Sequence, residues 1–347
     1  MSEMQADETV ETARTPLLHG TNPQAVISAI AQRHARRRAG DQRADGRKLG
    51  LVIEGGAMRG VLSAGGAVVL AQLGFSDVFD EIYATSAAVM NASYFMSNQP
   101  LLGISVYFDD CTTRQFVNPF RFWKVIDVDY IFDHVAVHEK PLNVSRLASS
   151  PSRLYVATID RRTGEAFLVD VKTAGVPILR VLKASAAIPI FYNRTVDIGG
   201  RQCMDGGLVI PFGITQAVAN GCTDVLVLST RSADYVSTRP SWLSRFMFNL
   251  ICSRGIAGMN RVFAERHLRS RESRDLSLGR TQPPQGVSIA TVCADAEQNV
   301  GRMTTDRRTL HAAAVSYGRK VLRVFGRDPG AWTLPHDCAG AARNAAE

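Results

Sequence analysis

The chain has 347 residues, of which 46% are hydrophobic and 21% are charged, a composition typical of a globular protein. This length can bury a large core and favours one large α/β domain or two smaller ones. The N-terminus is acidic and polar, without a basic region leading into an apolar stretch, so no signal peptide is predicted. The six cysteines are scattered without C-x-x-C spacing, which indicates reduced thiols and a cytoplasmic protein rather than a disulfide framework or a zinc site.

The formal net charge of +8 is unevenly distributed along the chain. Between Arg239 and Arg280 there are nine arginines but only three acidic residues, Glu265, Glu272 and Asp275. Apolar side chains are interleaved with these arginines, as on surfaces that bind anionic lipids. The simpler interpretation is a solvated helical pair with an ordinary apolar core face; a peripheral contact with an anionic membrane is the alternative. No nucleic-acid-binding motif is recognised, so nucleic acid is not expected as a partner.

In chain order, residues 1–47 are polar and charged and are predicted to form a flexible segment. Within this segment, Pro23–Arg38 is predicted to form a short helix with Asn22 as its cap. The folded domain is predicted over residues 48–326. Residues 327–347 are rich in alanine and glycine, and they are predicted to form a loose tail.

Apolar runs of strand length then alternate with helix-like stretches. A buried strand is predicted at Leu49–Ile53, followed by a glycine turn and a helix over Val61–Leu73. A second strand at Phe79–Tyr83 is followed by a helix over Ala87–Met96. This repeated order predicts a doubly wound α/β fold, with a mostly parallel sheet flanked by helices. The later predicted strands are Leu154–Ile159, Ala166–Val169, Thr195–Ile198, Gln202–Met204, Val225–Leu228 and Val287–Val292, and the later predicted helices are Val176–Ala187 and Thr305–Phe325.

The uncharged stretch Ile82–Phe108 is long enough to cross a bilayer. It also contains several polar residues, among them Asn91 and Ser93, and the loop signal Asn98-Gln99-Pro100. A buried helix followed by a loop is therefore the better interpretation.

Three short blocks indicate an acyl-transfer site when they are taken together. Glu54–Gly60 is a glycine-rich turn after a buried strand, and it can aim backbone N–H groups at an oxyanion. Ser86 follows a strand and precedes a helix, a turn that lifts a nucleophile above a sheet. Asp205 follows a strand and precedes Gly206 and Gly207, so that its carboxylate is placed as a candidate base for the serine.

Each block also has a simpler interpretation. Ser86 could cap a helix, and Asp205 could be an ordinary turn aspartate. The glycine turn could be a dinucleotide or phosphate loop, but it lacks the G-x-G-x-x-G spacing and the Walker lysine. A Ser–Asp–His triad would need a late histidine after a strand, whereas His311 lies in a helix-like stretch and His336 in the tail. A two-residue Ser86–Asp205 arrangement is therefore the better interpretation.

These blocks resemble those of the patatin-like phospholipases, from Leu51 to Leu228 and more faintly to the C-terminal helix. Three further segments are similar to sequences of that family: Asp127–Asp133, Ala184–Pro189 and Gly206–Val209. The resemblance implies a doubly wound α/β fold and a Ser–Asp dyad that hydrolyses acyl esters of lipids. It also implies that the chemistry needs no metal and no cofactor.

On this resemblance, Ser86 is the nucleophile and Asp205 is the proton acceptor. The N–H groups of Gly56, Ala57 and Ala87 are expected to hold the oxyanion. The full oxyanion and substrate-binding group comprises Gly55, Gly56, Ala57, Arg59, Gly60 and Ala87, with Arg59 in support. The aspartate turn is completed by Gly206 and Gly207.

The chain departs from the family pattern at three positions. Ala57 replaces a third glycine, and Ala84 and Ala88 replace the two glycines that flank the serine in G-x-S-x-G. Where such a position requires φ > 0, alanine costs about 1–2 kcal/mol. These departures motivate an alternative, a catalytically weak or inactive lipid- or membrane-binding protein on the same fold. Acyl transfer to an acceptor other than water is a further alternative. The sequence does not specify the head group or the chain length of the lipid.

Overall fold

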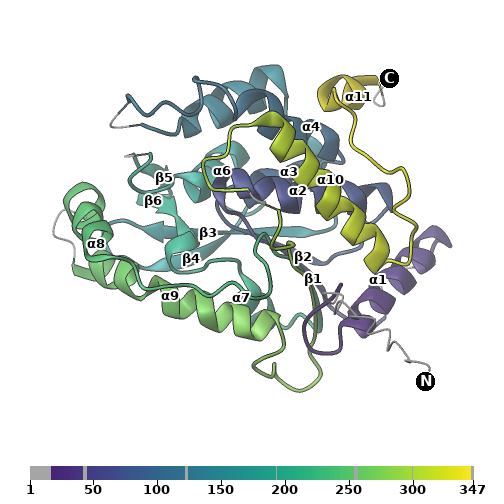
Figure 1. The fold of residues 1–347 in the computed structure, drawn as a ribbon. Helices are drawn as coiled ribbons and strands as arrows, with labels where there is room; N and C mark the ends of the chain where they lie inside the picture. Colours follow the sequence, from purple (N-terminus) through teal and green to yellow (C-terminus); the bar gives the residue numbers. More distant parts are fainter. Residues whose placement is uncertain are drawn as a thin grey trace, which may run out of the picture.

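A mixed, mostly parallel sheet runs through the centre of the molecule (Figure 1). The computed structural model describes residues 17–41, 45–121, 124–192, 194–253, 257–298 and 300–344, and within these ranges the sheet has eight strands. Their order is β5-β6-β3-β2-β1-β7-β8, with β4 also paired to β3. The strands are β1 (Leu49–Ile53), β2 (Glu81–Ala84), β3 (Arg153–Asp160), β4 (Ala166–Asp170), β5 (Val196–Ile198), β6 (Arg201–Asp205), β7 (Asp224–Leu228) and β8 (Ser288–Val292).

The middle of the sheet is parallel and buried. Strands β3, β2, β1, β7 and β8 pair in parallel in that order, while β4, β5 and β6 add antiparallel pairs on the β3 side. Every residue of β1, β2 and β7 is buried, because helices cover both faces of the sheet. The predicted doubly wound α/β class is confirmed.

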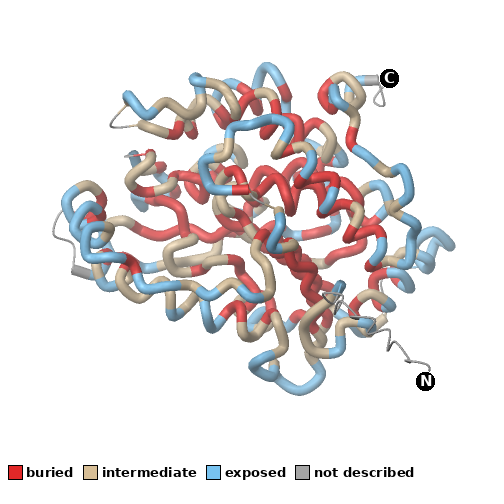
Figure 2. Tube along the Cα trace, in the orientation of Figure 1, coloured by how far each residue is buried: buried red, intermediate tan, exposed pale blue. Residues whose placement is uncertain are grey.

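Helices lie on both faces of this sheet, with α2, α3 and α10 on one face and α7 and α9 on the other (Figure 1). Figure 2 shows the buried residues concentrated in the sheet and in the helix faces turned toward it. The α-helices are α1 (Pro23–Arg38), α2 (Gly60–Gln72), α3 (Ala88–Met96), α4 (Pro100–Ser105), α5 (Val144–Ser149), α6 (Ile178–Ala186), α7 (Ile214–Ala219), α8 (Trp242–Phe248), α9 (Ala257–Ser277), α10 (Arg307–Val324) and α11 (Cys338–Asn344). The 3₁₀-helices are η1 (Ala57–Arg59) and η4 (Gly206–Leu208), and the π-helices are η2 (Val106–Asp110), η3 (Tyr130–Glu139) and η5 (Asn249–Ser253).

Most predicted elements are present, and their ends lie within about three residues of the predicted ends. The stretch Ile82–Phe108 is divided among β2, α3, α4 and η2, as expected of a buried helix and loop rather than a span. In the described part of the chain, no helix is both long enough and apolar enough to cross a membrane.

The two ends of the chain differ from the sequence prediction where the structure describes them. Helix α1 forms as predicted, but Asn22 has a φ of 57° and its side chain does not cap the helix. This helix is anchored rather than flexible, because the buried Arg33 forms ion pairs with Asp45 and Asp80. Residues 1–16 and 42–44 of the predicted flexible segment lie outside the described residues.

The predicted loose tail is attached to the domain at several points. Leu334 and Cys338 are buried, and α11 lies beside α4. The indole of Trp332 donates to Gln72 Oε1 at 2.8 Å. The alanine and glycine content of the segment does not reveal the few apolar side chains that attach it to the domain.

Candidate active site

The three predicted blocks meet at the carboxyl edge of the parallel strands. The glycine turn follows β1, Ser86 follows β2, and Asp205 ends β6. A Cβ on Gly55 would overlap the carbonyl oxygen of Thr85, so the turn after β1 is packed directly against the turn that carries Ser86. Glycine is required at this position by close approach of two backbones.

Ser86 lies in a strained turn between β2 and α3. Its φ is 61°, in the left-handed region that a non-glycine residue rarely adopts. The N-cap of α3 is Ala87, and no side-chain oxygen caps this helix. The helix-cap interpretation of Ser86 is therefore wrong, and the conformation is that of a nucleophile elbow.

The glycine turn presents backbone donors beside this serine. Gly56 has a φ of 139° and Ala57 a φ of 53°, so two successive residues take up unusual backbone conformations. Among the described residues, no acceptor is bonded to the N–H groups of Gly56, Ala57 or Ala87. These N–H groups are therefore free to bind an anionic oxygen that lies between the two turns.

Asp205 is held in a turn that leaves its carboxylate buried. Gly206 packs on the backbone of β3 so closely that a Cβ would overlap Ala157. The N–H of Gly207 donates to Asp205 Oδ1 at 2.8 Å. Burial raises the pKa of Asp205 to about 6, although the Gly207 N–H, the Ser86 hydroxyl and the charge of Arg302 act in the opposite direction. A carboxylate with such a pKa is suited to accept a proton near neutral pH.

Two residues that support the site were not predicted. The Tyr107 hydroxyl contacts both Asn91 Oδ1, at 3.1 Å, and the carbonyl oxygen of Ala87, at 3.4 Å. Asn91 Nδ2 in turn donates to the carbonyl oxygen of Gly60 at 2.8 Å. These bonds connect the start of α2 to α3 and so fix the two turns relative to each other. The signal in the sequence was an asparagine within a long uncharged stretch.

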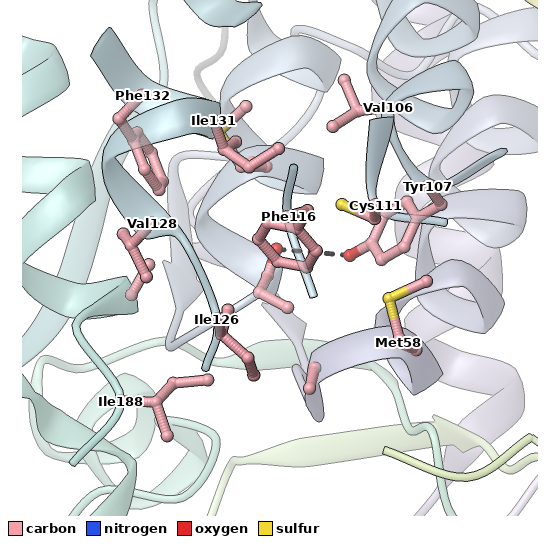
Figure 3. Close-up of a pocket in the computed structure, with 14 residues that line it drawn as sticks. Met58, Val106, Tyr107, Cys111, Phe116, Ile126, Val128, Ile131, Phe132 and Ile188 are labelled. Carbon is pink, nitrogen blue, oxygen red and sulfur yellow. Dashed lines mark hydrogen bonds between the residues drawn. The ribbon is translucent and has the colours of Figure 1, made fainter. Parts of the chain in front are cut away.

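A narrow apolar pocket opens between Ala57 and Ala87, the residues that flank the gap between the two turns. Its cavity volume is about 70 Å³. Figure 3 shows the side chains that surround it, which come from η1, α3, η2, η3, the end of α6 and the loops near them. The apolar lining includes Met58, Val106, Phe116, Ile126, Ile131 and Ile188. Such a lining suits a hydrocarbon chain.

The two late histidines are engaged with each other. The rings of His311 and His336 stack with centroids 5.3 Å apart, and the His311 ring nitrogen is bonded to the carbonyl oxygen of Leu334. In the ranges that the structure describes, no group of three or more His, Cys, Asp or Glu side chains is arranged to hold a metal ion.

The fold and this geometry define a doubly wound α/β protein with a serine and a buried carboxylate at the carboxyl edge of its sheet. Residues 51–218 match the family model described as patatin-like phospholipase. This part of the chain is therefore similar to the patatin-like phospholipases.

Two further proteins are similar to this chain. The uncharacterized protein YjjU of Escherichia coli (strain K12) is 31% identical over 206 residues. That match covers 57% of this chain and 56% of YjjU, so the chain spans little more than half the length of this curated relative. The crystal structure of VipD from Legionella pneumophila aligns with 52% of this chain and 49% of that chain, with 14% identity and a TM-score of 0.33.

Proposed function

We propose that the protein is a serine lipid acyl hydrolase in which Ser86 and Asp205 form the catalytic dyad. The observation that carries the proposal is the placement of a strained serine beside a buried carboxylate with a pKa of about 6. The patatin-like domain over residues 51–218 supports it independently.

In the proposed reaction, Ser86 Oγ attacks the ester carbonyl and Asp205 accepts its proton. The N–H groups of Gly56, Ala57 and Ala87 bind the oxyanion of the tetrahedral intermediate, and the alcohol leaves with the proton. Asp205 then activates a water molecule that releases the acyl group from Ser86. The apolar pocket holds the acyl chain during both steps. One donor of this kind contributes about 3 kcal/mol to such a reaction.

Two measurements on the purified protein test this assignment. A fluorophosphonate probe should label the wild type, and a short-chain nitrophenyl ester should be hydrolysed. Ser86→Ala should lose both properties, and Asp205→Asn should lose hydrolysis. Ser316→Ala removes an exposed serine from α10 and serves as the matched control. If either Ser86→Ala or Asp205→Asn retains hydrolysis, the assignment is contradicted.

The second candidate is a non-catalytic lipid-binding protein on the same fold. The replacement of a family glycine by Ala57, beside the serine and with a left-handed backbone, motivates this alternative. This candidate predicts binding to lipid vesicles without fluorophosphonate labelling of Ser86. Labelling at Ser86 contradicts it.

We also propose a peripheral contact with anionic membranes through α8 and its neighbours. Trp242 and Phe246, which lie one turn apart on α8, are 78% and 56% exposed, and Leu250 of η5 is 62% exposed. Phe248 points the other way and stacks on Phe263 of α9, with centroids 4.1 Å apart. An exposed apolar face beside arginines is the composition of helices that lie on membrane surfaces.

A further inference from the structure

The first N–H donor of the proposed oxyanion site belongs to the peptide between Gly55 and Gly56. In a trans peptide the C=O and N–H groups point in opposite directions, and the described residues contain no cis peptide. The direction of the Gly55 carbonyl oxygen therefore also sets the direction of the Gly56 N–H. Whatever holds this carbonyl oxygen decides whether the donor faces Ser86.

The Gly55 carbonyl oxygen is bound by a threonine that follows the neighbouring strand β7. The hydroxyl of Thr230, a buried residue, donates to this oxygen at 2.8 Å. β1 lies between β7 and β2 in the sheet, so Thr230 after β7 and Ser86 after β2 flank the glycine turn from opposite sides. Because the carbonyl oxygen of this peptide is turned toward Thr230, its N–H is turned toward the side of Ser86.

Thr230 is itself held in place by further hydrogen bonds. Its N–H and the Ser229 hydroxyl both donate to Glu54 Oε2, at 2.8 and 2.6 Å. On the other side of this loop, the Ser229 N–H donates to the carbonyl oxygen of Val292 at 2.9 Å. The loop is therefore attached both to the end of β1 and to the end of β8, which fixes the position of the Thr230 hydroxyl.

The N–H groups of Ala57 and Ala87 are oriented by the backbone instead. The carbonyl oxygens that share their peptides accept from backbone N–H groups three residues further along the chain, at 3.2 and 3.0 Å. Among the described residues, the Gly55 carbonyl oxygen accepts only from the Thr230 side chain. A single hydroxyl thus orients the first donor.

We propose that Thr230 is a positioning residue that aims the Gly56 N–H at the oxyanion. The inference rests on the proposed hydrolase function and adds a residue to its site, while the roles of Ser86 and Asp205 stay as proposed. Without the hydroxyl, the buried carbonyl oxygen loses its partner and the peptide is free to rotate. An effective donor lies about 2.7–3.1 Å from the oxyanion, so a small rotation of the peptide weakens it.

The kinetic test removes the hydroxyl and keeps the size of the side chain. For a short-chain nitrophenyl ester, Thr230→Val should lower kcat by about 10-fold or more with little change in KM, because the oxyanion develops only in the transition state. Thr230→Ser keeps the hydroxyl and should retain most of the wild-type rate. Thr291→Val is the matched control, because it removes a buried hydrogen bond from Thr291 in β8 to the carbonyl oxygen of Ser277, and kcat should not change.

A tetrahedral ligand separates the aiming of the donor from a general loss of structure. With a trifluoromethyl ketone, Ser86 Oγ adds to the carbonyl carbon, Asp205 takes the serine proton and the carbonyl oxygen becomes an oxyanion. In Thr230→Val, the affinity for this ketone should fall by the same factor as kcat/KM. The affinity for the corresponding trifluoromethyl alcohol, which forms no oxyanion, should not change. If Thr230→Val does not fold, Thr230→Ala and Thr230→Ser differ by the hydroxyl alone and provide the same comparison.

The outcomes distinguish this inference from the proposed function. If the wild type hydrolyses esters and Thr230→Val has the same kcat and ketone affinity, the positioning role is refuted while the hydrolase assignment stands. The positioning role is also refuted if Thr291→Val or Thr230→Ser loses as much activity as Thr230→Val. If the wild type hydrolyses no ester and binds no ketone, the hydrolase assignment fails and the positioning role fails with it.

Discussion

At the candidate site, two non-glycine residues have left-handed backbones. Ala57 has a φ of 53° and Ser86 a φ of 61°. The other two alanines that replace family glycines have ordinary backbone conformations, because Ala84 ends β2 and Ala88 begins α3. The strain that the sequence allowed at three alanines is therefore confined to Ala57, where the glycine of the family would relieve it.

Ala57→Gly is expected to stabilise the protein. A left-handed conformation costs alanine about 1–2 kcal/mol, and glycine removes this cost. Glycine also makes the unfolded chain more flexible, which lowers the free energy of unfolding by about 0.4–1 kcal/mol. The net gain in the free energy of unfolding should be about 0.5–1 kcal/mol, measured by urea denaturation. Ala88→Gly is the matched control, and it should destabilise the protein by about 0.5–1 kcal/mol, because glycine weakens a helix. A loss of stability in Ala57→Gly would contradict this account of the strain.

The pH dependence of hydrolysis follows from the raised pKa of Asp205. Asp205 must be ionised to accept the serine proton, and its pKa is about 6. For a nitrophenyl ester, kcat/KM should therefore rise with pH through a midpoint near 6 and level off above it. The measurement is a pH profile under conditions where the wild type stays folded. A profile that is flat from pH 5 to pH 8 contradicts the role of Asp205 as the base.

The same shift makes Asp205 a source of instability at neutral pH. Its pKa is raised from 3.8 to about 6, so the folded state holds the proton more tightly than the unfolded state does. Stability contributed by this group is complete below the unfolded pKa and is lost as pH rises through the folded pKa. Asp205→Asn does not titrate and still accepts from the Gly207 N–H, so its advantage over the wild type should grow by about 1 kcal/mol from pH 5 to pH 8. Urea denaturation at the two pH values measures this difference.

Some residues at the site were not predictable from a single sequence. Ser86 and Asp205 stand next to strands and glycines, and these local patterns indicated their roles. Tyr107 has no such local pattern, because it reaches the site only through the tertiary fold. Its position depends on how η2 packs in the folded protein, which was not part of the prediction.

Among the elements, those with a strong local pattern were predicted well. The buried strand β1 and the helices α2 and α3 were predicted to within about two residues, because apolar periodicity and flanking glycines mark them. Element α11 was missed because its seven residues have no apolar stripe, although Asp337 caps the helix by accepting the Gly340 N–H at 2.7 Å. The sequence showed that apolar residues lie within the basic region that contains α8. It could not show which of these residues are buried and which are exposed.

The contact between two turns gives an element-scale prediction at Gly55. A Cβ there would overlap Thr85 O, so Gly55→Ala must push the turn after β1 away from the turn that carries Ser86. A displacement of about 1 Å in a catalytic group can cost 10²-fold in rate, so kcat should fall by about that factor. Gly301→Ala is the matched control, because a Cβ there would meet only Thr304 Oγ1, at 3.4 Å. Equal activity of the two variants would show that the spacing of the turns does not matter.

At the scale of the whole molecule, the site and the apolar face of α8 are linked through α9. α9 packs against α8 and also against η4, the turn that follows Asp205. Exposed residues along α8 appear at the end of the molecule where α8 and α9 meet (Figure 2). α9 therefore connects the proposed membrane contact to the turn that follows Asp205.

This arrangement predicts different effects on soluble and membrane-bound substrates. Replacing both Trp242 and Phe246 by alanine removes exposed apolar area without touching the core, so folding and hydrolysis of a short-chain soluble ester should be unchanged. Binding to vesicles that contain phosphatidylglycerol should fall by about 10-fold or more, because aromatic side chains supply much of the interfacial affinity. Hydrolysis of lipid in those vesicles should fall with it. Val137→Ala, at an exposed apolar position on η3, is the matched control. Vesicle flotation of the wild type should also weaken as salt is added, because the arginines near α8 attract the anionic surface over about one Debye length. Equal flotation of the wild type and the double variant would show that the membrane contact lies elsewhere.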